Sequence, residues 1–221
     1  MCVNLLLKTT KVHRQLNKIF IFIFFIILFS SISFAQEVYH GCGMDGSARS
    51  KKVKDLNELK NRFNFPEAKD FDKNVTLKAM LLPGNDLKRW NYHKAAEITG
   101  YIYNVKPGGI ESCNCEAKNL LYRDTHIELI LNPNETAETK RVIVEVTPRI
   151  RAIMEKKGIN WTTQALRKNF LGKWVKVQGW LMFDAEHAKQ SGNTNPENTK
   201  DWRATAWEIH PVTNIEIVTK H

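Results

Sequence analysis

The sequence predicts a mainly β protein, built as a five-stranded Greek-key barrel with a helical extension on its N-terminal side. Short apolar and β-branched runs recur after residue 95, and turn residues separate them. These runs occur in the order of three strands, a helix and two strands. A segment with helical spacing precedes them. The three observations predict one barrel domain, residues 96–221, and an extension, residues 36–95, that packs on it.

Five segments of the barrel domain have the pattern of strands. Each is a short apolar run or alternates apolar and polar residues. The fourth places Val175, Val177 and Leu181 on one face. Gly179 between them predicts a bend or bulge. The predicted strands cover residues 96–106, 125–131, 141–148, 174–184 and 203–217.

Helical spacing predicts two helices. The first covers residues 54–63, where apolar residues are three and four apart. The second has Thr162 or Thr163 as its N-cap and ends at Gly172, so it lies between the third and fourth strands. The apolar run 75–83 we interpret as one further strand in the extension.

The order of these elements resembles the OB-fold, a small five-stranded Greek-key barrel. The segment GKWVKVQGWL, residues 172–181, is similar to the Gly-Lys-apolar entry of many OB-fold strands. The resemblance covers residues 96–217 and implies a ligand face beside the first and last strand connections. The segments CGMDGSARS and RATAWEIHPVT resemble an exported bacterial family, which implies no particular activity. The secreted thermonucleases are also OB-folds, but their full set of arginines and acidic calcium ligands has no counterpart here.

The first 35 residues have the pattern of a secretory signal peptide. Basic residues without any acidic one precede the apolar run 19–32, and the small residues Ser33 and Ala35 fit a cleavage site. The run is shorter than the roughly 20 residues of a spanning helix, and an uncleaved anchor is the alternative. Cleavage near Ala35 predicts a periplasmic or extracellular protein, with no transmembrane domain in the mature chain.

The charge balance permits a polyanion partner without requiring one. The whole chain has a formal net charge of +10. Its first 35 residues hold four of the 33 basic residues and none of the 23 acidic ones, which leaves +6 on the mature chain. A mild excess of this size is also ordinary for a protein that is simply soluble.

Three cysteines remain after the predicted cleavage, namely Cys42, Cys113 and Cys115. An oxidising compartment favours a disulfide. A bridge between Cys113 and Cys115 would close a small, strained ring, so we expect Cys42 to pair with one of them. The third thiol is then free, bound to metal or paired between chains.

Two long connections are the candidate ligand-binding segments. The first joins strands one and two and contains both Cys113 and Cys115. The second, residues 185–202, is rich in Asn, Thr and Lys, and loops of this length often carry function. In the OB-fold reading the two connections flank the same face.

Alternating positions on two strands offer ligands for a divalent metal such as zinc. Asp124 and His126 share one face, followed by Glu128, and Glu208 and His210 share a face late in the last strand. Imidazole together with carboxylate suits a divalent ion. The spacing matches no zinc signature, so ordinary hydrogen-bonded pairs are the alternative. The predicted ligands are Asp124, His126 and His210.

Aromatic residues alternating with lysine predict a second kind of site. Tyr101 and Tyr103 share a face of the first strand, and Lys176 and Trp180 share a face of the fourth. Such a face can stack bases or sugar rings. The alternative is that these rings pack against the N-terminal extension.

We therefore expect an exported binding or accessory module, with a polyanion, an oligosaccharide or an envelope protein as its partner. The sequence contains no recognisable catalytic constellation, which favours binding over catalysis. One alternative is a metal-assisted hydrolase of phosphodiester or glycan bonds. Another is a structural protein of the cell envelope.

Overall fold

The computed structural model describes residues 39–219, and the predicted signal segment lies outside them. All described residues belong to one compact unit. No helix within residues 39–219 combines the length and the apolar character needed to cross a membrane.

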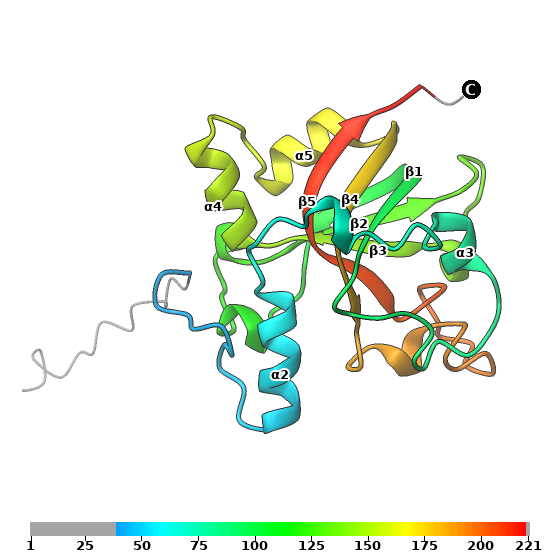
Figure 1. The fold of residues 1–221 in the computed structure, drawn as a ribbon, viewed down its shortest axis with the longest axis horizontal. Helices are drawn as coiled ribbons and strands as arrows, with labels where there is room; N and C mark the ends of the chain where they lie inside the picture. Colours follow the sequence, from blue (N-terminus) through cyan, green and yellow to red (C-terminus); the bar gives the residue numbers. More distant parts are fainter. Residues whose placement is uncertain (1–38, 220–221) are drawn as a thin grey trace, which may run out of the picture. The chain divides into compact units, whose positions relative to one another are not determined.

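The unit is mainly β and contains a closed five-stranded barrel, which confirms that part of the prediction (Figure 1). The strands close in the order β1-β2-β3-β5-β4. β3 and β5 pair in parallel, and the other neighbours are antiparallel. The observed strands are β1 (Ala95–Pro107), β2 (Thr125–Ile130), β3 (Val142–Val146), β4 (Trp174–Phe183) and β5 (Trp207–Ile217).

Four α-helices accompany the barrel in the described part of the chain. Two of them follow β3 and precede β4, and the second has Thr162 as its N-cap. The first helix begins at the cap Ser50 and ends three residues before the predicted end. The helices are α2 (Lys51–Lys60), α3 (Leu77–Leu81), α4 (Pro148–Lys156) and α5 (Thr163–Phe170).

The strand predicted for residues 75–83 is wrong, because this run forms the short helix α3. The hydroxyl of Thr76 accepts a hydrogen bond from the backbone N–H of Ala79 and caps the helix. Leu77 and Met80, three residues apart, are both buried against the barrel. An apolar run this short is compatible with the residue spacing of either a helix or a strand, and the N-cap at Thr76 favours the helix.

Apolar side chains from all five strands fill the barrel. Ile98, Ile127, Val144, Val177 and Ile209 are examples, each no more than 1% exposed. The predicted bulge is present, since the β4–β5 register shifts on both sides of Gly179. A Cβ at that position would collide with the backbone oxygen of Pro211. The glycine therefore allows the two strands to approach closely.

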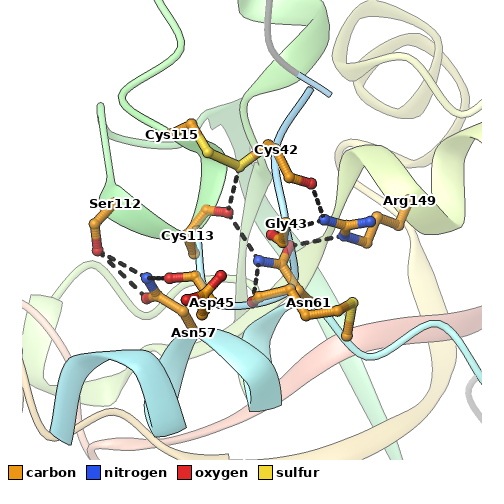
Figure 2. The surroundings of a disulfide bond; sticks show 10 residues. Cys42, Gly43, Asp45, Asn57, Asn61, Ser112, Cys113, Cys115 and Arg149 are labelled. Carbon is orange, nitrogen blue, oxygen red and sulfur yellow. Dashed lines mark hydrogen bonds between the residues drawn. A yellow bond between two sulfur atoms is a disulfide. The ribbon is translucent and has the colours of Figure 1, made fainter. Parts of the chain in front are cut away.

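A disulfide joins the N-terminal segment to the β1–β2 connection (Figure 2). Cys42 pairs with Cys115, which confirms the expected bridge and selects one of the two possible partners. Cys113 is the free thiol and is buried. The Asn61 amide donates to the backbone oxygen of Cys113, and the Arg149 guanidinium donates to that of Cys42. The segment is thus held by the covalent bond and by the side chains of Asn61, the C-cap of α2, and Arg149 of α4.

Candidate functional site

The two long connections both contribute to the lining of one cavity of about 230 Å³. The β1–β2 connection contributes Gly108, Gly109 and Glu111 to its lining. The β4–β5 connection contributes His187 and Trp202. Closure of the barrel therefore brings together the two segments that the sequence singles out. The rest of the lining is Lys60, Lys106, Pro107, His126, Glu145, Asp184, Arg203 and Glu208.

A group of charged and polar side chains lies beside and beneath this cavity, and we call it the buried polar cluster. It combines residues from α2, from both connections and from β2, β3 and β5. Nine of its side chains belong to buried residues, and Glu111 and His187 are partly exposed. The cluster consists of Lys60, Glu111, Cys113, Asp124, His126, Glu145, Asp184, His187, Arg203, Glu208 and His210.

Glu145 bridges the two buried histidines of the cluster. β2 and β3 place it directly opposite His126, whose Nδ1 lies 2.8 Å from Glu145 Oε1. Glu145 Oε2 lies 3.5 Å from His210 Nδ1. Burial raises the pKa of Glu145, but the His126 hydrogen bond and the His210 charge outweigh it and lower the pKa to about 2. Burial lowers the pKa of His126, but hydrogen bonds to Glu128 and Glu145 raise it to about 9.

Asp124 and His210 face each other in the interior. Asp124 is 2% exposed and His210 is fully buried. His210 Nε2 lies 3.7 Å from Asp124 Oδ2, too far for a hydrogen bond. His210 Nε2 and Asp124 Oδ1 have no hydrogen-bond partner among residues 39–219. Burial raises the pKa of Asp124 to about 7, against the opposing charge of His210.

Arg203 joins the side of the cluster next to the β4–β5 connection. Its guanidinium lies 3.4 Å from Asp184 and also pairs with Glu208. His187 Nδ1 lies 2.6 Å from the same Asp184 carboxylate. The Trp202 ring packs 4.3 Å from the Arg203 guanidinium carbon. These contacts fix the aromatic ring that borders the cavity.

The cluster contains more carboxylates than permanent cations. Its carboxylates number five, and its permanent cations are Lys60 and Arg203. Lys60 Nζ lies 2.6 Å from Glu111, so both cations are already paired inside the cluster. With its three histidines neutral, the cluster would carry three negative charges without a permanent counter-charge. Buried charge of this kind is costly unless a cation or a proton offsets it.

Burial also determines the state of Cys113. Its thiol lies 3.5 Å from Glu111 and 3.9 Å from Asp124. Burial raises the pKa of Cys113 well above its usual range, and the charge of Asp124 raises it further. The thiol is therefore neutral and unsuited to nucleophilic chemistry.

The predicted metal ligands Asp124, His126 and His210 all belong to this cluster. The sequence reasoning did not find Glu145, which lies between the two histidines. The available signal was a glutamate within an apolar strand, since every residue of β3 is buried. It also did not find Asp184, His187, Arg203 or Lys60. Their sequence positions lie in three different segments, and only the fold joins them.

The predicted stacking residues lie away from the cavity, and each contacts another part of the protein. Tyr101 packs edge-on against Trp174, and Tyr103 lies under the Arg141 guanidinium. Lys176 forms ion pairs with Glu97 and Glu216. Ligand binding by these three side chains stays a prediction.

Trp180 is the exception among them, because it is 7% exposed. Its indole N–H donates to the backbone oxygen of Asn64, and the Arg62 guanidinium lies over its ring. This side chain packs against the N-terminal extension, as the alternative interpretation had it. Little of its surface is exposed, and ligand binding by Trp180 stays a prediction.

Chemically, the cavity offers carboxylates and imidazoles as hydrogen-bond partners and metal ligands, with one aromatic ring at its border. Almost every charged group of the lining is paired with another charged group. Comparison of the chain with protein-family models and with curated proteins finds no match. The function is therefore inferred from the cavity and the buried polar cluster themselves.

Proposed function

We propose that the chain is an exported binding module, in which an OB-like barrel holds one end of an oligosaccharide in the cavity. The observation that carries the proposal is the cavity itself. Both long connections border it, and its lining combines paired charged groups with the indole ring of Trp202. Ligand sites of this kind fix orientation with a few placed polar groups.

The OB-like identity is supported by the order of the elements. Three strands are followed by two helices and two strands, and the strands close into a barrel. The loops that border the cavity are the ones that flank the ligand face in that fold. Export is supported by the disulfide between Cys42 and Cys115, because such bonds persist in oxidising compartments.

The charge pattern favours a neutral, hydroxyl-rich ligand over a polyanion. Lys60 and Arg203 are the buried cations of the lining, and carboxylates already neutralise both. Glu111, Asp184 and Glu208 are paired with these cations, and Glu145, the remaining carboxylate of the lining, would repel phosphate or sulfate groups. The same carboxylates accept hydrogen bonds from hydroxyl groups. The volume is below the roughly 300–1,000 Å³ of drug-sized pockets, which suits a single ring better than a whole chain.

The test is calorimetric titration of the mature protein with soluble chito-, cello- and malto-oligosaccharides. At least one series should bind, and Trp202→Ala should weaken its binding by at least about tenfold, equivalent to 1.4 kcal/mol of lost stacking. Tyr92→Ala is the matched control, since Tyr92 is an exposed aromatic residue outside the cavity lining. Its binding should equal that of the unmodified protein.

Two results would contradict the proposal. One is salt-sensitive retention on a polyanion such as heparin without any sugar binding, which would reassign the ligand class. The other is sugar binding that Trp202→Ala leaves unchanged, which would place the ligand outside the cavity.

A further inference from the structure

We propose that Asp124, Glu145 and His210 form a binding site for one transition-metal dication such as Zn²⁺, directly beneath the cavity. Each of the three offers an oxygen or nitrogen atom, and these atoms lie within 4.8 Å of one another. They come from the start of β2, from β3 and from β5, so the closed barrel brings them together. Glu145 also lines the cavity, which connects the site to it.

Two polar atoms of these residues are buried without a hydrogen-bond partner, which is the observation that points to an ion. The nitrogen Nε2 of His210 and the oxygen Oδ1 of Asp124 make no hydrogen bond within the part of the chain that the structure describes. Both residues are at most 2% exposed. Leaving a buried polar atom unsatisfied costs about 1–3 kcal/mol. A metal ion that accepts both lone pairs removes this cost.

The surrounding residues orient the ligands as in known metal sites. His210 Nδ1 lies 3.2 Å from Glu208 Oε2, so an Nδ1–H donated to Glu208 leaves the Nε2 lone pair for the ion. His126 Nδ1 lies 2.8 Å from Glu145 Oε1 and fixes the orientation of that carboxylate. His126 is therefore a positioning residue in this arrangement, whereas the sequence predicted it as a ligand.

The two carboxylates of the proposed site are paired with histidines rather than with lysine or arginine. Five carboxylates face two permanent cations, and both cations are paired with Glu111, Asp184 or Glu208. Asp124 and Glu145 have no Lys or Arg partner within 4 Å among residues 39–219. A dication between these two carboxylates would add positive charge next to both of them.

The ligand set favours a transition metal over calcium or magnesium. Calcium and magnesium prefer oxygen ligands alone, whereas imidazole suits zinc and its neighbours. Three protein ligands leave a coordination position open, as in zinc sites that also bind water or a further ligand.

The experiment uses the tag-free mature protein with its disulfide intact. After chelator treatment and reloading with zinc, elemental analysis should find one ion per chain. Cobalt should replace zinc and give the visible absorption bands of a protein-bound ion. Glu145→Gln and His210→Gln should each weaken zinc binding by at least about tenfold. Circular dichroism verifies that each variant is folded, and the isosteric Glu145→Gln variant decides if His210→Gln does not fold.

Matched variants make the assignment specific. His93→Gln removes an exposed histidine outside the cluster and should leave zinc binding unchanged. Cys113→Ser distinguishes a second possible group, Glu111, Cys113 and Asp124, whose ligand atoms also converge within 4.8 Å. Zinc binding that survives Glu145→Gln but not Cys113→Ser would overturn the assignment. So would binding of calcium or magnesium in preference to zinc, or the absence of stoichiometric binding.

The metal site and the sugar site can fail separately. Titration of the chelator-treated protein with the oligosaccharides tests the cavity alone. Sugar binding without stoichiometric zinc would overturn the metal site and leave the proposed function in place. Zinc binding without sugar binding would overturn the proposed function and leave the metal site in place.

Discussion

Most residues of the buried polar cluster are as buried as the apolar core of the barrel, but the two regions differ in the sign of their burial energy. Core side chains such as Leu129 and Val177 gain about 25 cal/mol for each Å² of apolar surface removed from water. Burial of Glu145 or Arg203 costs free energy that only precise pairing offsets. The core therefore explains why the chain folds, and the cluster requires a different explanation.

Strand β2 shows the difference within six residues. Ile127 and Leu129 belong to the apolar core, while His126 and Glu128 alternate with them on the opposite face. All of its residues are buried, so both faces of the strand are covered. Trp202, from the β4–β5 connection, packs 5.7 Å from the His126 ring. The long connections thus form a polar layer over part of the barrel.

The largest effect on stability should come from breaking an ion pair in the polar region. Arg203→Met leaves Asp184 and Glu208 buried without their cation and should lower the free energy of unfolding by about 3–5 kcal/mol. Urea denaturation measures this loss in the free energy of unfolding. Ile127→Val, a trimming of the core, should cost only about 1 kcal/mol. Similar losses from both variants would show that the two regions do not differ as described.

Removal of the disulfide should have the next largest effect. The double variant Cys42→Ser with Cys115→Ser opens a covalent loop of 73 residues and should lower stability by about 3–4 kcal/mol. Urea denaturation under non-reducing conditions is the measurement. The control is Cys113→Ser, which leaves the bridge intact. A control that loses as much as the double variant would attribute the effect to Cys113 packing.

A smaller effect should follow from crowding the core at its bulge. Gly179→Ala adds a methyl group against the Pro211 backbone and the Ile209 side chain. Overpacking of this kind costs about 1–3 kcal/mol. Thermal unfolding should show a lower midpoint for this variant, and Gly41→Ala is the control because its Cβ meets no neighbour. Equal midpoints would mean that β4 and β5 can separate at no cost.

The smallest effect concerns pH and the pair of His187 and Asp184. The hydrogen bond to Asp184 raises the pKa of His187, against burial, and Arg203 and Glu208 also face it. The contribution of His187 to the free energy of unfolding is thus fully present below its unfolded pKa of about 6.5. It is lost as the pH rises through the higher pKa of the folded state. The pKa of Asp184 is lowered despite its burial, chiefly by this hydrogen bond and by Lys60 and Arg203. Its contribution is present above pH 3.8 and lost on acidification.

Urea denaturation of the unmodified protein and of His187→Asn tests this between pH 5 and pH 9. The difference in stability should be under about 1 kcal/mol, because the side chain is partly exposed, and it should shrink with rising pH. A difference that grows with pH would reverse the assigned direction of the His187 shift.

The strands could be predicted from the sequence because burial imposes a period of two or an apolar run on each of them. The predicted strand ends differ from the observed ones by a few residues, as in β2, where the strand stops at Ile130. The run that became α3 could not be assigned this way, because five residues are too short to separate the two periods. For this segment the N-cap residue Thr76 is the signal that indicates a helix.

The site was predictable only in part. Asp124 and His126 are neighbours in sequence, so alternation alone places them on one face. Glu145 and His210 join them through the β2–β3 register and the parallel β3–β5 pairing. No local pattern encodes which strands become neighbours. The sequence therefore indicated Asp124, His126 and His210 and could not place Glu145 between the two histidines.

Because β5 pairs with both β3 and β4, the cylinder cannot close before this last strand has been synthesised. His210 lies on it, so the proposed ion has no complete coordination sphere in any shorter folding intermediate. Acquisition of the ion would then mark the end of maturation. A chain that lacks this last strand would leave the carboxylates Asp124 and Glu145 of the buried polar cluster exposed.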